Sequence, residues 1–215
     1  MPAQSVNGIE IHYDLTGSGR RTCLFIHGSG GRGASWIRQL ERLADAARVV
    51  ALDLPGHGQS GGEGYSVIED YVRLVRGFVE AAELGKVVLG GHSMGGAVAQ
   101  AFALAYPERL DGLILVGTGA RLRVLPKIFE LLRADYPEGV RFINGRAFSR
   151  STAQRLKDAA RARALETRPQ VTIGDYTACN GFDVMERIGA LRIPTLVLGG
   201  EDDQLTPPKY ARYLA

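Results

Sequence analysis

Short, continuous apolar runs recur along the chain and predict buried β-strands. Each run is rich in leucine or β-branched residues and ends at Gly, Pro or Asp. The runs cover residues 22–27, 48–52, 86–90, 112–117 and 194–199. Near the N-terminus, residues 7–14 turn and then alternate apolar with polar positions, which predicts an edge hairpin strand. Because the other runs are continuous, we expect a sheet that is covered on both faces.

Helical patterns separate these runs. They lie at residues 34–46, 66–84 and 95–106, so strands and helices alternate along the first half of the chain. This alternation predicts an α/β fold with a doubly wound, mostly parallel sheet and right-handed crossovers. In such sheets ligands bind at the carboxyl ends of the strands.

The alternation breaks after Gly117 and resumes at Pro194. Residues 124–136, 140–148 and 152–167 read as helices, with breaks at residues 137–139 and at Arg168-Pro169. A structureless loop of this length is improbable in a compact domain. We therefore expect a helical cap insertion at residues 121–189, on a core made of residues 1–120 and 190–215.

Composition and charge narrow the possible partners. With 215 residues and 45% hydrophobic content, the chain can bury a sizeable core as one domain with an insertion. Its net charge of +3 is too small to indicate nucleic-acid binding, and the basic excess in residues 121–170 is best explained by solvated helix faces. No membrane span or signal peptide is evident, so we expect a cytoplasmic protein with unpaired Cys23 and Cys179.

The most informative segment is residues 87–105, where an apolar strand, a Gly-His-Ser-Met-Gly turn and a helix of small residues follow one another. This context is that of a nucleophile elbow, which exposes a serine on a sharp turn. Ser93 is therefore the candidate nucleophile, and Gly91 and Gly95 leave room for the turn. The alternative is a phosphate-binding turn, but the chain has neither a dinucleotide fingerprint nor a P-loop sequence.

Two further loops follow predicted strands. His27-Gly28-Ser29-Gly30-Gly31 is rich in small residues and suits an oxyanion hole, for which the candidate donors are the backbone amides of Met94 and Ser29, with Gly30 as a substitute for Ser29. In the loop from Asp53 to Ser60, we expect Asp53 and His57 to hydrogen-bond backbone rather than to act in catalysis.

Taken together, these motifs resemble the α/β-hydrolase fold family along nearly the whole chain, and in particular small bacterial carboxylesterases and enol-lactonase-like serine hydrolases. The resemblance extends to residues 106–110 and to Gly199–Pro207. It implies a carboxylate after the late strand, four residues ahead of a proline, which is Asp203 rather than Asp202. It also implies that the chain uses no cofactor or metal.

In this family's order of residues, a histidine follows the acid. The histidines of this chain are His12, His27, His57 and His92, and none follows Asp203. Either the chain is a fragment of a longer, C-terminally complete hydrolase, which we favour, or it naturally lacks the general base.

The expected function is hydrolysis of a small-molecule carboxylic ester or related acyl bond by a serine hydrolase. The alternative is a non-hydrolytic small-molecule binder or receptor on the same fold. The sequence leaves the substrate and the oligomeric state open.

Overall fold

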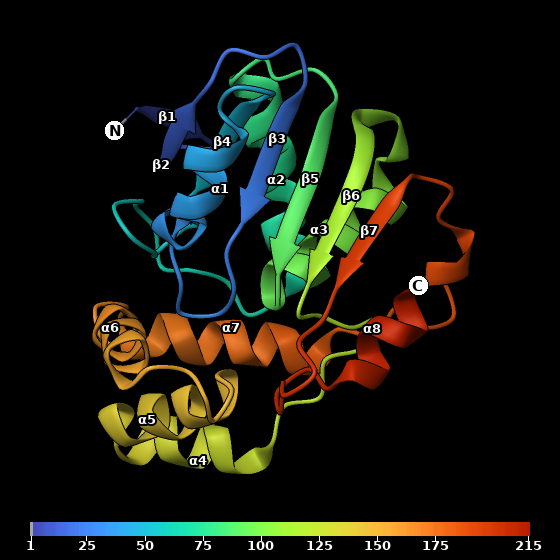
Figure 1. Cartoon of the computed structure of the whole chain (residues 1–215). Helices are drawn as coiled ribbons and strands as arrows, with labels where there is room; N and C mark the ends of the chain where they lie inside the picture. Colours follow the sequence, from blue (N-terminus) through green and yellow to red (C-terminus); the bar gives the residue numbers. More distant parts are fainter. Residues whose placement is uncertain (1) are drawn as a thin grey trace.

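A computed structural model describes residues 2–215 and contains one seven-stranded sheet (Figure 1). The strands are β1 (Ala3–Val6), β2 (Ile9–Thr16), β3 (Thr22–Ile26), β4 (Arg48–Leu52), β5 (Val87–His92), β6 (Leu110–Val116) and β7 (Thr195–Leu198). Their order across the sheet is β1-β2-β4-β3-β5-β6-β7. The pairs β1–β2 and β2–β4 are antiparallel and the remaining pairs are parallel. The predicted mostly parallel α/β sheet is confirmed.

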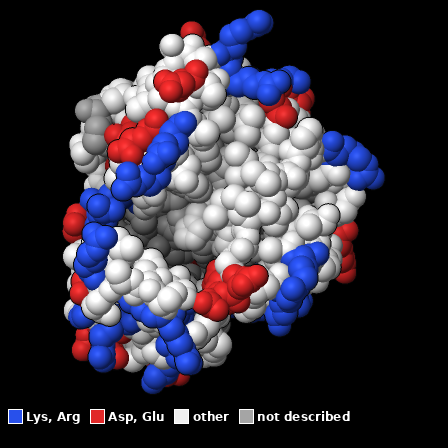
Figure 2. Space-filling view, in the orientation of Figure 1, with Lys and Arg blue, Asp and Glu red and all other residues white. Residues whose placement is uncertain are grey.

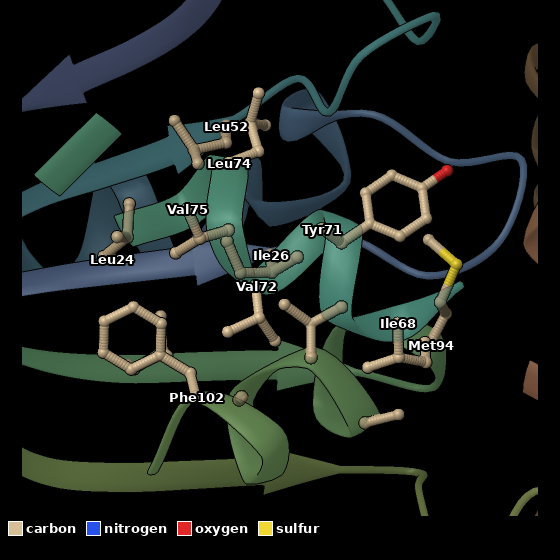
Figure 3. Close-up of a cluster of buried hydrophobic side chains, with 14 of the residues drawn as sticks. Leu24, Ile26, Leu52, Ile68, Tyr71, Val72, Leu74, Val75, Met94 and Phe102 are labelled. Carbon is tan, nitrogen blue, oxygen red and sulfur yellow. The ribbon is translucent and has the colours of Figure 1, made fainter. Parts of the chain in front are cut away.

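Helices α2 (Ile68–Ala81) and α3 (Met94–Ala105) cover one face of the sheet. Figure 3 shows side chains of β3, α2 and α3 meeting there, among them Leu24, Val75 and Phe102. Each fully buried side chain of this size contributes roughly 1.5–3 kcal/mol to folding. This apolar layer fixes the end of β5, and therefore the turn that follows it.

Helix α1 (Ile37–Leu43) packs on the opposite face, where Trp36 stacks on Phe25 of β3 with ring centroids 4.6 Å apart. This helix covers β2 and β4 but does not extend over β7. Leu196 and Leu198 of β7 are therefore 52% and 47% exposed. Figure 2 shows few charged side chains on this part of the surface. The expectation that both faces of the sheet are covered is therefore wrong at β7.

Four helices lie across the carboxyl ends of the strands, and we call residues 126–181 the cap (Figure 1). They are α4 (Pro126–Ala134), α5 (Tyr136–Ala147), α6 (Gln154–Ala164) and α7 (Pro169–Gly181). Pro137 was expected to separate two helices. Instead it occupies the first turn of α5, where a missing N–H costs nothing, and Asp135 caps that helix by accepting a hydrogen bond from the Glu138 amide.

Helix α7 was not predicted. It starts with Pro169 in its first turn and runs directly along the carboxyl edge of the sheet. Helix α8 (Pro208–Leu214) follows β7. Cys23 and Cys179 are both free, as expected. Within residues 2–215, no helix is both long and apolar enough to cross a membrane.

Candidate active site

Ser93 stands on a sharp turn between β5 and α3, with φ 53° and ψ −117°. This φ lies in the left-handed region, which few non-glycine residues adopt. The turn depends on glycine: a Cβ on Gly91 would lie 2.1 Å from the Gly95 carbonyl oxygen, and one on Gly95 would lie 2.3 Å from the Ile26 carbonyl oxygen. The Ser93 side chain makes no capping hydrogen bond to α3, which argues against the simple helix-cap alternative.

The loop of residues 28–31 lies against this turn, because a Cβ on Gly28 would come within 3.2 Å of the Ser93 Cβ. Two donors hold the Gly28 carbonyl oxygen: His27 Nδ1 at 2.8 Å and the Gly31 amide at 2.9 Å. The peptide unit is trans, so its N–H, which belongs to Ser29, points the opposite way. The backbone N–H groups of Ser29 and Met94 have no hydrogen-bond acceptor within residues 2–215.

His27 is neutral in this arrangement, as its two ring nitrogens indicate. Nε2 accepts a hydrogen bond from the Leu54 amide at 3.1 Å, so the ring proton is on Nδ1, which donates to Gly28. Burial lowers the pKa of His27 well below its usual value, in agreement with this tautomer. Through these two hydrogen bonds His27 joins the loop of residues 28–31 to the backbone of Leu54.

The Gly30 amide is already engaged, because it donates to Asp175 Oδ2 at 2.7 Å. The expectation that Gly30 can replace Ser29 as an oxyanion donor is therefore wrong. Asp175 belongs to α7, and its carboxylate is completely buried. The sequence analysis missed this residue because α7 itself was missed. A signal was present, since Pro169 is a typical first residue of a helix.

Asp175 collects three hydrogen bonds in all. Besides Gly30, Tyr71 Oη donates to Oδ1 at 2.6 Å and His57 Nε2 donates to Oδ2 at 2.8 Å. His57 Nδ1 faces the Pro55 carbonyl oxygen at 3.0 Å, so both ring nitrogens face acceptors and the ring is an imidazolium. Burial alone would lower the pKa of His57, but the Asp175 carboxylate outweighs it and the net shift is upward.

The loop of Asp53 and His57 is a structural unit, as the sequence predicts. Asp53 Oδ1 accepts from the Gly33 amide at 2.7 Å and Oδ2 accepts from the Gln59 amide at 2.9 Å. His57 is held between Pro55 and Asp175. Neither side chain is available to activate Ser93.

Asp203 follows β7, and its carboxylate accepts hydrogen bonds from the residues of the loop that comes next. Its Oδ1 accepts from the amides of Leu205 and Thr206, both at 2.9 Å, and Oδ2 accepts from the Thr206 hydroxyl at 2.7 Å. Asp202 turns toward the cap instead and accepts from the Ser149 hydroxyl. The two neighbouring carboxylates therefore point in different directions, and Asp203 lies at the carboxyl edge of the sheet.

His92 lies near this carboxylate. Its Nε2 and Asp203 Oδ2 lie 3.4 and 3.6 Å from the position that a Cβ on Gly117 would take. His92 and Ser93 line different cavities. Within residues 2–215, no imidazole hydrogen-bonds to Ser93 or to Asp203.

Two cavities meet at this edge. The larger measures about 460 Å³ and lies between core and cap, where the surface in Figure 2 is hollowed. Ser29, Trp36 and His92 line it from the core, and mostly apolar side chains line it from α5, α6 and α7. The smaller measures about 70 Å³ and contains Ser93. Tyr176 borders both.

Burial raises the pKa of Cys179 to about 12, so this cysteine beside Ser29 stays a neutral thiol. Within residues 2–215, no three His, Cys, Asp or Glu side chains are grouped so as to hold a metal ion.

The sequence model of the alpha/beta hydrolase family matches residues 23–215. The chain belongs to this family. A 2-hydroxy-6-oxononadienedioate/2-hydroxy-6-oxononatrienedioate hydrolase of Paraburkholderia xenovorans is 33% identical over 93% of the chain and 76% of its own length. The dihydrolipoyllysine-residue acetyltransferase component of the acetoin cleaving system from Cupriavidus necator is 42% identical, but the match spans 52% of the chain and only 30% of that protein.

Solved structures of alpha/beta hydrolases agree with this assignment. A thermophilic esterase from Thermogutta terrifontis superposes with a TM-score of 0.87 at 31% identity, over 100% of this chain and 85% of that one. The enol-lactonase from Burkholderia xenovorans has a TM-score of 0.92 at 24% identity, over 100% of this chain and 86% of that one, and shows the common fold. This hydrolase family is the one that the sequence resembles.

Proposed function

We propose that the chain hydrolyses a carboxylic ester or related acyl bond through an acyl-enzyme intermediate on Ser93. One observation carries the proposal: Ser93 stands at positive φ beside the backbone N–H groups of Ser29 and Met94, which have no hydrogen-bond acceptor within residues 2–215. Paired amide donors next to an exposed serine suit the charge that develops on a carbonyl oxygen during acyl transfer. The 31% identical esterase supports an ester as the substrate class.

In this route the Ser93 oxygen attacks the carbonyl carbon, and its proton passes to a general base. The two amides hold the oxyanion of the tetrahedral intermediate. The C–O bond to the leaving group then breaks, and the alcohol takes up the proton. Water attacks the acyl-serine in the same way and regenerates Ser93. Asp203 would orient and stabilise the protonated base, which is a histidine in this type of site.

The base is the part that the described side chains do not supply. His27 and His57 are buried and fully hydrogen-bonded, and His92 lines the other cavity. Full turnover therefore requires an imidazole between Ser93 and Asp203. Free imidazole is small enough to test this requirement without changing the chain.

The larger cavity indicates an apolar arm on the substrate. Its walls include Trp36, Val140, Ile143 and Phe148, with few polar groups. We propose a small-molecule ester whose carbonyl sits at Ser93 and whose apolar arm lies under the cap. The absence of a cofactor and the cytoplasmic location remain predictions from the sequence.

The decisive experiment measures acylation of Ser93 by p-nitrophenyl acetate with and without added imidazole. Peptide mass mapping locates the acetyl group, and Ser93→Ala is the control. We expect an acetyl group on Ser93 that forms faster as imidazole is added and is absent from the variant. A fluorophosphonate probe should give the same pattern.

Two other results would change the conclusion. Acylation that is insensitive to imidazole but still requires Ser93 would mean that a base already serves the serine. No acylation under any condition would contradict the hydrolase proposal. It would favour the non-hydrolytic binder, for which the lack of an imidazole at Ser93 is the supporting observation, and tight binding of a small apolar ligand without product would then be expected.

A further inference from the structure

Residues of the cap hydrogen-bond to both the amide and the carbonyl oxygen of Gly30. Asp175 of α7 accepts from the Gly30 amide at 2.7 Å, and the Thr167 hydroxyl donates to the Gly30 carbonyl oxygen at 3.0 Å. All three residues are shielded from solvent at these contacts. Gly30 also has φ +65°, and Thr172 Oγ1 lies 3.2 Å from the position of a Cβ there. The loop of residues 28–31 is thus built partly from residues more than a hundred positions away in the sequence.

Asp175 is itself fixed to the core. Tyr71 and His57 donate to its two oxygens at 2.6 and 2.8 Å, and the exposed fractions of the His57 and Asp175 side chains are both 0%. A buried carboxylate without these donors would be strongly unfavourable. The carboxylate therefore has one position, and the Gly30 amide that it binds has one position as well.

Ser29 lies between two peptide units that are held from different parts of the molecule. His27 and the Gly31 amide hold the unit before it, through the Gly28 carbonyl oxygen. The cap holds the unit after it, through the Gly30 amide. The two units share the Cα of Ser29, so the cap contact adds a second restraint on the unit that carries the Ser29 N–H, beside the restraint from the core.

We propose that Asp175 and Thr167 are positioning residues that set the Ser29 amide as an oxyanion donor, so that the docked cap is a structural part of the oxyanion hole. The inference rests on the proposed acyl chemistry. Donors to an oxyanion act because they are fixed in advance at 2.7–3.1 Å from the developing charge, and loss of one such donor typically lowers the rate about 10²–10³-fold. A cap that loses its hold on Gly30 would weaken this donor while Ser93 itself stays in place.

Thr167→Val is the sharpest variant, because it removes one hydroxyl and keeps the shape of the side chain. Thr167→Ser restores the hydroxyl. Thr177→Val is the matched control, since the exposed Thr177 hydroxyl donates to the Ile173 carbonyl oxygen of its own helix α7 and not to the loop of residues 28–31. Asp175→Ala removes the other contact, and its fold is first checked by near-ultraviolet circular dichroism. Should Asp175→Ala not fold, the Thr167 variants decide alone.

Two measurements are made on each protein. The first is the imidazole-assisted acylation of Ser93, resolved into the maximal rate and the ester concentration at half-maximal rate. We expect Thr167→Val to lower the maximal rate about tenfold or more with little change in the half-saturating concentration, and Thr167→Ser and Thr177→Val to match the wild type. The second is amide hydrogen exchange of residues 28–31, which should accelerate in Thr167→Val and Asp175→Ala alone.

The two readings separate this inference from the proposed function. If Ser93 of the wild type is never acylated, the acyl chemistry fails and the catalytic role given to Asp175 and Thr167 fails with it, although exchange still reports whether the cap orders the loop. If Ser93 is acylated and Thr167→Val matches Thr177→Val in both measurements, the proposed function stands and this inference is overturned. A change in the half-saturating concentration alone would also overturn it, because it indicates a role in binding the ester.

Discussion

Gly91 sets the tightest geometric limit at the elbow. A methyl group there would lie 2.1 Å from the Gly95 carbonyl oxygen, which belongs to the backbone and has no room to retreat. We expect Gly91→Ala to lower the free energy of unfolding by about 3 kcal/mol or more, at the upper end of overpacking effects. Urea unfolding measures this change.

Gly145→Ala is the matched control for that variant. Gly145 lies in α5, and nothing is within 4 Å of the position of its Cβ. Alanine should therefore stabilise the protein by about 0.5 kcal/mol through helix propensity. A Gly91→Ala protein as stable as the Gly145→Ala protein would show that the elbow has more room than its geometry implies.

His57 makes stability depend on pH. Because the Asp175 carboxylate raises its pKa in the folded protein above the ordinary value of 6.5, its stabilising effect is complete below pH 6.5 and is lost as the pH rises through the raised value. The groups that face it are Asp175, Asp53 and His27. The lowered pKa of His27 keeps that ring neutral in the folded protein above pH 6.5.

The test compares wild type with His57→Gln by urea unfolding at several pH values from 6.5 upward. We expect the stability advantage of the wild type to shrink with rising pH, by at most about 1.4 kcal/mol per unit, the slope for one proton. An advantage that is constant over this range would mean that His57 is not protonated at Asp175.

At the scale of elements, the strands were predictable and the helices near the site were less so. Strands such as β5 are short apolar runs bounded by glycine, and this pattern survives in any context. Helix α7 carries buried Asp175 and Thr172 on a short sequence without clear periodicity, because it packs against polar loops as well as the core. Its partners Gly30 and Tyr71 lie far away in the sequence, so only the fold brings them together.

Strand β7 is the element most exposed to association with other chains. Leu196 and Leu198 face the same side of the strand and are about half exposed on the bare part of the sheet. We expect Leu196→Lys with Leu198→Lys to reduce concentration-dependent association, measured by sedimentation velocity. Leu156→Lys, at an equally exposed site on α6, should have little effect. A wild type that is monomeric at every concentration would contradict this expectation.

At the scale of the whole molecule, side chains of both the core and the cap line the larger cavity. Ala160 of α6 lines this cavity, whereas Ala162 on the same helix is exposed. Ala160→Phe should therefore slow acylation of Ser93 by p-nitrophenyl hexanoate relative to the acetate about tenfold, since the added ring fills space for the longer chain. Ala162→Phe is the control. Equal effects on both esters would place the acyl chain elsewhere.

The sequence allows Ser93 and Ser29 to be proposed as site residues because each sits in a local motif at the end of a predicted strand. Asp203 is proposed through the resemblance to the family. The sequence could not show that the Gly30 amide is occupied, since that follows from a contact with a cap residue 145 positions away. The local motifs of this site can be recognised in the sequence, whereas its long-range hydrogen bonds cannot.

The pairing of β6 with β7 has a consequence for the order of folding. Leu113 pairs with Thr195, so closing this pair encloses the whole cap, whereas β5 and β6 are joined through α3 and a short connection. Loop closure costs more entropy as the loop grows, and distant pairings form slowly. During synthesis the ribosome also releases β6 long before β7. Strand β7, which Asp203 follows, therefore joins the sheet after β5 and β6 have paired, and until it does, the edge of β6 stays open.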